Sequence, residues 1–198
     1  MSDNFTSWFP SEFAASLFII VYFFWTASEL FKTVWSRRHQ FMANTQHKDH
    51  GSYWIILAIV WGSMIISLLL RSRHVGVFQN NFQYIGIGIE IIGIALREWA
   101  VLTLGRSFSV VVAILPGQTI VQNGPYRWVR HPAYTGSILT LIGFALGLGA
   151  WIASLVILVI CFVGFLYRIQ VEEKALVEVF GKEYQEYMQR TWRLFPGL

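Results

Sequence analysis

Five long apolar stretches divide this sequence, and they constrain its fold more than any other feature. They cover residues 11–35, 52–70, 82–104, 132–148 and 151–167. A helix needs about 20 apolar residues to cross the roughly 30 Å hydrocarbon core of a bilayer, and these stretches meet or approach that length. We therefore expect an all-α polytopic membrane protein with about five transmembrane helices. Only Gly149 and Ala150 separate the last two stretches, which predicts a helical hairpin.

The composition also indicates lipid as the natural solvent. Hydrophobic residues make up 55% of the 198 residues and charged residues only 13%, and the mean hydropathy is +0.51. An ordinary soluble domain carries about 25% charged residues. The residues before the first stretch include Asp3 but no lysine or arginine, so the basic region of a cleaved signal peptide is missing. We expect the first helix to be retained.

Lysine and arginine are distributed unevenly between the connecting segments. Thirteen of the 15 lie in 32–51, 97–131 and 168–198, whereas the connection 71–81 holds two and the turn of the hairpin holds none. Basic residues favour the cytosolic side of a membrane. The pattern predicts an N-terminus outside and a C-terminus in the cytosol. It also explains the net charge of +4 without a nucleic-acid partner.

The third stretch carries the ionisable residues Glu90, Arg97 and Glu98. Such groups are costly at membrane depth and need a partner or a purpose. We expect Arg97 and Glu98 at the cytosolic interface and Glu90 hydrogen-bonded to a neighbouring helix, with a place in a substrate cavity as the alternative. Small residues in the same stretch would permit close helix packing, and they are Gly86, Gly88 and Gly93.

Between residues 105 and 131 the chain becomes polar and should leave the membrane on the cytosolic side. Asn123-Gly124-Pro125 is a turn signal, and Pro132 suits the first position of a helix. His131 would then lie at a helix N-terminus, where free N–H groups and the helix dipole favour an anionic group such as a carboxylate. A loop that only anchors to lipid headgroups explains these residues equally well.

A second polar group, Arg168, Glu172 and Glu173, follows the fifth stretch. Arg168 and Glu172 are four residues apart on one helix face, so a simple intrahelical ion pair is an alternative to a functional site. Apolar residues then recur at helical spacing between positions 176 and 188, opposite charged residues. They predict a C-terminal amphipathic helix along the membrane or over the loop.

The two segments share a longer pattern. Gly124-x-Tyr126-x-x-x-Arg130-His131-Pro132-x-Tyr134-x-Gly136 is followed by Glu172-Glu173 and then by Phe180-Gly181-x-Glu183-Tyr184-x-x-Tyr187. Over roughly residues 100–195 the chain thereby resembles the isoprenylcysteine carboxyl methyltransferase family. The resemblance implies a membrane enzyme that uses S-adenosylmethionine, releases S-adenosylhomocysteine and methylates the carboxylate of a lipophilic acceptor, such as a prenylated cysteine.

The resemblance also implies the place of the site. Residues 1–104 would form three N-terminal membrane helices, and residues 105–198 the catalytic region of the same domain, with a cytosolic cofactor-binding loop. Arg168 would bind the acceptor carboxylate, and Glu172 would act in catalysis and contact the cofactor. The other implied cofactor-binding residues are Gln118, Thr119, Ile120, Val121, Tyr126, His131, Pro132, Ala133 and Tyr134.

The chemistry of methyl transfer suits these residue types. Displacement at a sulfonium carbon needs two reactants in near-attack geometry and no metal. A carboxylate acceptor is already ionised near neutral pH, so no general base is needed. An arginine can orient it through two parallel hydrogen bonds, which makes Arg168 the first candidate for substrate positioning.

Three other functions fit the same residues. A phospholipid-type N-methyltransferase would use the same cofactor, but a base such as Glu172, Glu173 or His131 would have to deprotonate the acceptor ammonium. A sterol-type membrane reductase shares the His-Pro-x-Tyr motif and needs no glycine fingerprint. A non-enzymatic membrane scaffold is the third.

Overall fold

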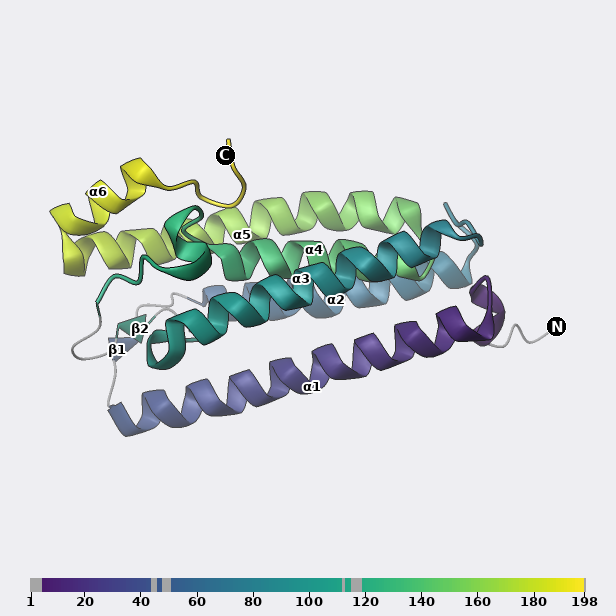
Figure 1. Cartoon of the computed structure of the whole chain (residues 1–198), viewed down its shortest axis with the longest axis horizontal. Helices are drawn as coiled ribbons and strands as arrows, with labels where there is room; N and C mark the ends of the chain where they lie inside the picture. The colour runs from purple at the N-terminus through teal and green to yellow at the C-terminus, as the bar shows by residue number, and fades with distance from the viewer. Residues whose placement is uncertain (1–4, 44–45, 48–50, 112, 115–118, 198) are drawn as a thin grey trace.

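The computed structural model describes residues 5–43, 46–47, 51–111, 113–114 and 119–197, and most of them are helical (Figure 1). The long helices are α1 (Glu12–Ala43), α2 (Ser52–Ser72), α3 (Phe82–Leu104), α4 (Pro132–Gly147) and α5 (Trp151–Phe180), and the short α6 (Lys182–Arg190) follows. The described part also contains 3-10 turns at Phe5–Trp8, Gly105–Ser107 and Gly124–Arg127, and an antiparallel pair of two-residue strands, β1 (Gln46–His47) and β2 (Ala113–Ile114). The expectation of an all-α protein is confirmed apart from this short pair.

Each of the five apolar stretches forms one of the long helices, so the predicted helix positions are confirmed. Within the described residues, three helices are long and apolar enough to cross a membrane, namely Glu12–Arg38 of α1, α2 and α5. The apolar α4 has only 16 residues, and α3 carries Glu90, Arg97 and Glu98. The count of five crossings therefore stays a prediction.

The long helices alternate in direction, so their connections gather at two opposite ends. At one end the segment between α2 and α3 meets the turn between α4 and α5. The Phe78 N–H donates to the Gly149 carbonyl at 2.8 Å, and the Trp151 N–H donates to the Gly76 carbonyl at 3.0 Å. This turn makes α4 and α5 the predicted hairpin.

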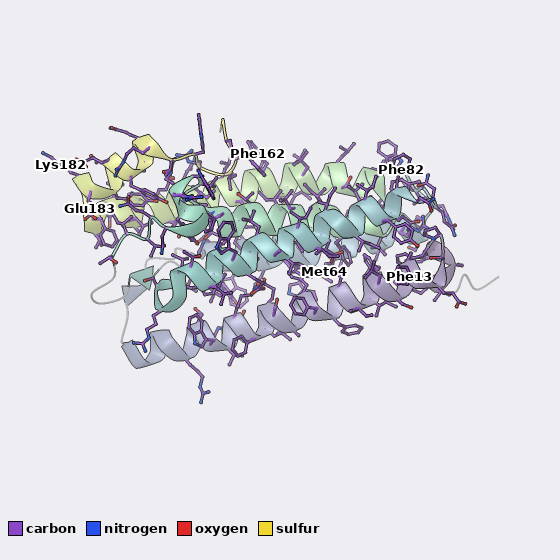
Figure 2. All side chains as sticks on the ribbon, viewed as in Figure 1. Phe13, Met64, Phe82, Phe162, Lys182 and Glu183 are labelled. Carbon is purple, nitrogen blue, oxygen red and sulfur yellow. The ribbon has the colours of Figure 1, made fainter. Side chains whose placement is uncertain are left out.

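The opposite end holds β1, β2, the turn at Gly124–Arg127 and α6 (Figure 1). In Figure 2, Phe13 and Phe82 mark the end with the turn between α4 and α5, and Lys182 and Glu183 mark the end with α6. The segments predicted to be cytosolic therefore share one end, which a common site requires. We refer to it as the α6 end. Its orientation toward the cytosol stays a prediction.

α3 and α4 pack with their backbones almost in contact because glycines lie between them. A Cβ atom placed on Gly93 would lie 2.4 Å from the backbone nitrogen of Thr140, a distance that real Cβ atoms essentially never show. A Cβ atom on Gly136, the last residue of the Arg-His-Pro motif, would lie 2.7 Å from the backbone nitrogen of Arg97. Gly93 of α3 thus serves packing within the chain, whereas Gly88 meets nothing within 4 Å.

The C-terminal amphipathic segment is two helices, which corrects the prediction of one. α5 continues beyond the apolar stretch to Phe180, and α6 begins at Lys182. Gly181 joins them with a φ of 56°, a conformation that glycine adopts without strain. The break lets α6 lie over the loop, where the Tyr187 hydroxyl donates a 2.7 Å hydrogen bond to the Tyr126 carbonyl.

Glu90 also departs from its prediction. The residue is fully buried, and both carboxylate oxygens are without a hydrogen-bond partner among the described residues. The expected hydrogen bond to a neighbouring helix is therefore wrong for this part of the chain. At the Glu90 backbone α4 presents Gly143, and glycine has no side chain that could donate.

Gly93→Ala is expected to destabilise the folded bundle by about 1–3 kcal/mol, because the added methyl group would overlap the Thr140 backbone. Gly88→Ala is the matched control, since a Cβ atom at Gly88 meets nothing within 4 Å and alanine has the higher helix propensity. The thermal unfolding midpoints of the two variants in detergent measure the difference. Equal midpoints would contradict the proposed packing.

Candidate active site

A cavity of about 380 Å³ lies among the helices at the α6 end, and side chains from all six α-helices line it. Its polar part lies beneath α6, where Tyr184 and Tyr187 face it. Its apolar part extends between the helices toward Met64, which lies near the middle of the molecule in Figure 2. The cavity therefore reaches from the loop into the apolar interior of the bundle.

Most of the predicted site residues line this cavity. They are Thr119, Ile120, Val121, Tyr126, His131, Ala133, Tyr134, Arg168 and Glu172. Pro132 does not line it; it is buried as the first residue of α4, and it begins the helix so that its two neighbours reach the cavity. Gln118 lies outside the described residues. The structure thus brings the loop, the start of α4 and the end of α5 together.

Tyr134 links the two residues predicted to be catalytic. Its hydroxyl donates a 2.6 Å hydrogen bond to Oε2 of Glu172 and accepts a 3.1 Å hydrogen bond from Nε of Arg168. The phenol thus lies between a carboxylate and a guanidinium. The three side chains form one hydrogen-bonded unit across α4 and α5, which we call the Tyr134 unit.

Arg168 is only 2% exposed, and further elements hold it besides Tyr134. It donates to the hydroxyl of Ser52, the first residue of α2, and from Nη2 to the carbonyl of Val110 at 3.0 Å. Sequence reasoning missed Ser52 and Val110 because they lie 116 and 58 residues from Arg168 and belong to no motif. A guanidinium held from several sides keeps the fixed orientation that recognition of a planar carboxylate requires.

Glu173 has different neighbours from Glu172 and is not among the side chains that line the cavity. Its buried carboxylate accepts hydrogen bonds from Arg130 at 2.9 Å and from Arg193 at 2.8 Å. The tail and the loop also pair through their backbones, since the Arg130 N–H donates to the Trp192 carbonyl at 2.7 Å. Glu173 therefore joins the motif loop to the C-terminal tail.

His131 lies directly before α4, as predicted, and is buried between the two glutamates. Its Nε2 is 3.3 Å from Oε1 of Glu173, and its Nδ1 is 4.0 Å from Oε2 of Glu172. Its ring stacks on Tyr134, with centroids 5.6 Å apart and an angle of 13° between the planes. Both ring nitrogens therefore face protein carboxylates, and an anionic ligand at this ring would be repelled by them.

α6 closes the polar part of the cavity. Burial raises the pKa of Tyr187 to about 12, so its hydroxyl is protonated at neutral pH and donates to the Tyr126 carbonyl. The turn that carries Tyr126 begins at Gly124, which has a φ of 56°. A Cβ atom there would also lie 2.9 Å from Oγ1 of Thr103. Glycine therefore lets this turn rest against α3.

The remaining lining is mostly apolar. Its apolar side chains include Trp25, Leu30, Ile56, Leu57, Val60, Trp61, Met64, Leu141 and Phe165. Along α2 the lining runs from Tyr53 to Met64, about three helical turns or roughly 16 Å. A site with one polar part and one long apolar part suits an amphiphilic ligand.

An ion pair between α1 and α3 forms part of the wall. Arg97 donates from Nε to Oε1 of Glu29 at 2.5 Å and from Nη2 to Oε2 at 2.7 Å, and both residues line the cavity. For Arg97 the structure therefore supports the alternative prediction, that it lines a cavity. The sequence could not indicate the pair, because its members are 68 residues apart.

Comparison with known proteins connects this chain with one family. The sequence model of the isoprenylcysteine carboxyl methyltransferase family matches residues 86–178. The protein-S-isoprenylcysteine O-methyltransferase B of Arabidopsis thaliana is 32% identical over 136 residues, which cover 65% of this chain and 69% of the plant protein. A probable protein-S-isoprenylcysteine O-methyltransferase of Oryza sativa subsp. indica is 35% identical over 115 residues, which cover 57% of this chain and 60% of the rice protein.

The fold is similar to that of a solved structure, the eukaryotic intramembrane Ras methyltransferase. The two share a TM-score of 0.60 and 25% sequence identity, over 71% of this chain and 52% of the other. This chain thus spans 60% of the rice relative and about half of the solved chain. The family match begins inside α3 and ends near the end of α5, so it includes the Tyr134 unit.

Glu173→Gln is expected to loosen the C-terminal tail, because the amide cannot pair ionically with Arg130 and Arg193. Breaking a buried ion pair lowers the free energy of unfolding by about 3–5 kcal/mol. We expect a loss at the lower end of this range, because Arg193 is partly exposed. Hydrogen exchange of the Trp192 amide should become faster. Glu183→Gln, on the exposed face of α6, is the matched control. Unchanged exchange in both variants would mean that Glu173 does not hold the tail.

Proposed function

This chain belongs to the isoprenylcysteine carboxyl methyltransferase family, and we propose that it transfers a methyl group from S-adenosylmethionine to the carboxylate of a lipophilic acceptor such as a prenylated cysteine. The products are a methyl ester and S-adenosylhomocysteine. The distribution of basic residues supports a reaction at the cytosolic face of the membrane, with the N-terminus outside.

One observation carries the proposal: the Tyr134 unit and a long apolar wall line the same cavity. A water-soluble cofactor needs the polar part, and a prenyl chain needs the apolar part. The reacting groups must meet where the two parts join, because displacement requires both reactants in one near-attack arrangement. Tyr134, Arg168, Glu172 and Arg97 are among the polar residues of this shared lining.

The cavity suits S-adenosylmethionine in size and chemistry. Its volume of about 380 Å³ lies within the range of small-molecule sites. Tyr126, Tyr134 and Tyr184 present aromatic rings to it, and Glu172 adds a carboxylate. Aromatic faces and carboxylates stabilise a cation such as a sulfonium. When bound, the cofactor supplies an electrophilic methyl group.

The protein residues have to orient the acceptor and exclude water. Arg168 holds the acceptor carboxylate through N–H groups in the plane of its guanidinium, which Tyr134, Ser52 and Val110 keep in place. Glu172 fixes the Tyr134 hydroxyl on the side opposite Arg168. Since the acceptor is ionised at neutral pH, none of these groups has to remove a proton.

Purified protein in detergent or nanodiscs is expected to bind S-adenosylhomocysteine saturably and to methylate a prenylcysteine with radiolabelled cofactor. The product should release labelled methanol in base, because carboxyl methyl esters are base-labile and N-methyl groups are not. A panel of prenylcysteines, fatty acids and ethanolamine lipids identifies the acceptor class. Saturable binding with only base-stable product would replace the carboxyl acceptor by an amine, and absence of binding would contradict the methyltransferase.

Arg168→Lys is expected to lower kcat/KM for the acceptor by about 100-fold, because an ammonium cannot form two parallel hydrogen bonds with a carboxylate. The Kd for S-adenosylhomocysteine should change by less than about threefold, as only the acceptor side is altered. Arg190→Lys, at the exposed end of α6, is the matched control. Unchanged methyl transfer by a folded Arg168→Lys variant would exclude this role.

A further inference from the structure

α1 is the outermost long helix and runs along one side of the bundle (Figure 1). Its outer surface is apolar, as expected of a surface that faces lipid, with Phe23, Phe24, Phe31 and Val34 all exposed. On its inner side the same helix carries Glu29 and Lys32, which are charged residues in an apolar helix. This combination needs an explanation beyond packing.

Four charged side chains join α1 to α3. Glu29 holds Arg97 through two hydrogen bonds, and the same carboxylate lies 2.7 Å from Nζ of Lys32, which also pairs with Glu98. Arg97 additionally donates from Nη1 to the Ala133 carbonyl at 3.3 Å. Since Ala133 directly precedes Tyr134, this cluster fixes α1 relative to the Tyr134 unit.

The cluster lies beside the place where the cavity reaches the outside of the bundle. Leu30 on α1 and Trp61 on α2 both line the cavity, although they are 67% and 56% exposed. A residue that lines a cavity and is also largely exposed marks an opening. The opening therefore lies between α1 and α2, and Glu29 is the residue next to Leu30.

Charged groups in an apolar wall cost free energy that hydrophobic side chains would not, so the cluster is a poor means of stabilising the bundle. A bidentate carboxylate–guanidinium pair does provide a fixed geometry. Its value at this position is therefore the exact placement of α1 beside the opening rather than a gain in stability.

We propose that Glu29 and Arg97 form a positioning pair for the lipophilic acceptor. The pair holds α1 as one wall of the opening between α1 and α2, through which the acceptor reaches the cavity from the membrane. The apolar tail then lies along Trp25, Val60 and Met64, while the polar head stops beside the Tyr134 unit. This inference rests on the proposed function and adds to it two residues that position the acceptor.

The pair acts on the acceptor and not on the cofactor, which separates it from a general structural role. Loss of either charge should raise KM for the acceptor about tenfold, while kcat and the Kd for S-adenosylhomocysteine stay within about twofold. Because the two residues act as one unit, the double variant should raise KM no further than the single variants.

The experiment measures these constants for Glu29→Gln, Arg97→Gln and the double variant, with N-acetyl-S-farnesylcysteine as the acceptor. Glu12→Gln, on the exposed start of α1, is the matched control. Changes in kcat or in cofactor affinity equal to those in KM would overturn the proposal. So would single effects that multiply in the double variant.

A second pair of variants tests the same wall without removing a charge, in case the first set does not fold. Leu30→Trp narrows the opening and should also raise KM about tenfold. Phe31→Trp is the control, since Phe31 is 71% exposed and is not among the cavity-lining residues. Equal KM values for these two variants would place the acceptor's route elsewhere.

The proposed function and this inference fail in different ways. If the wild-type protein binds S-adenosylhomocysteine and methylates the farnesyl compound, but the variants at Glu29, Arg97 and Leu30 match their controls, only the inference is wrong. If the wild-type protein transfers no methyl group, the proposed function is wrong. Equilibrium binding of radiolabelled N-acetyl-S-farnesylcysteine then still tests the pair, and equal affinities of wild-type and variant proteins would overturn it.

Discussion

The close approach of α3 and α4 is the constraint on which the rest of the site depends. Gly93 and Gly136 remove the side chains that would hold the two helices apart. Arg97 of α3 can therefore reach the carbonyl of Ala133 at the start of α4. Tyr134 follows in the next position and faces the cavity. One backbone contact thus sets both the position of Arg97, which binds α1, and the position of the Tyr134 unit.

Two adjacent glutamates serve different purposes because successive side chains of a helix point in different directions. Glu172 lines the cavity and accepts the hydrogen bond from Tyr134. Glu173 holds Arg130 and Arg193 and so attaches the tail to the motif loop. A single turn of α5 therefore contributes one residue to the cavity and one to the attachment of the tail.

The cavity offers a place where the two reactants of the proposed function, which differ in solubility, can meet. Its polar part lies beneath Tyr184 and Tyr187 of α6, and its apolar part reaches Met64 inside the bundle. In the proposed reaction the cofactor comes from the water and the acceptor from the lipid. The membrane then acts as the solvent that supplies one substrate, and the bundle keeps water away from the junction.

The sequence by itself determined the helices and the local motifs. Runs of apolar residues set the starts of α2, α3, α4 and α5, because helix length and burial in lipid are local properties. Most of the site residues predicted from the motifs do line the cavity, with Gln118 outside the described residues and Pro132 buried beside the lining. The counts of lysine and arginine predicted that the segments 32–51, 97–131 and 168–198 lie at the same end of the molecule.

Only the tertiary structure decided which distant residues complete the site. Ser52 reaches Arg168 across 116 residues, and Glu29 reaches Arg97 across 68. Neither pair has a sequence spacing that could indicate it. Among the described residues Glu90 has no hydrogen-bond partner, and this absence and the break at Gly181 likewise depend on what neighbouring elements present. Apolar periodicity specifies each helix, whereas the pairing of polar groups follows from how the helices pack, and no single helix contains that information.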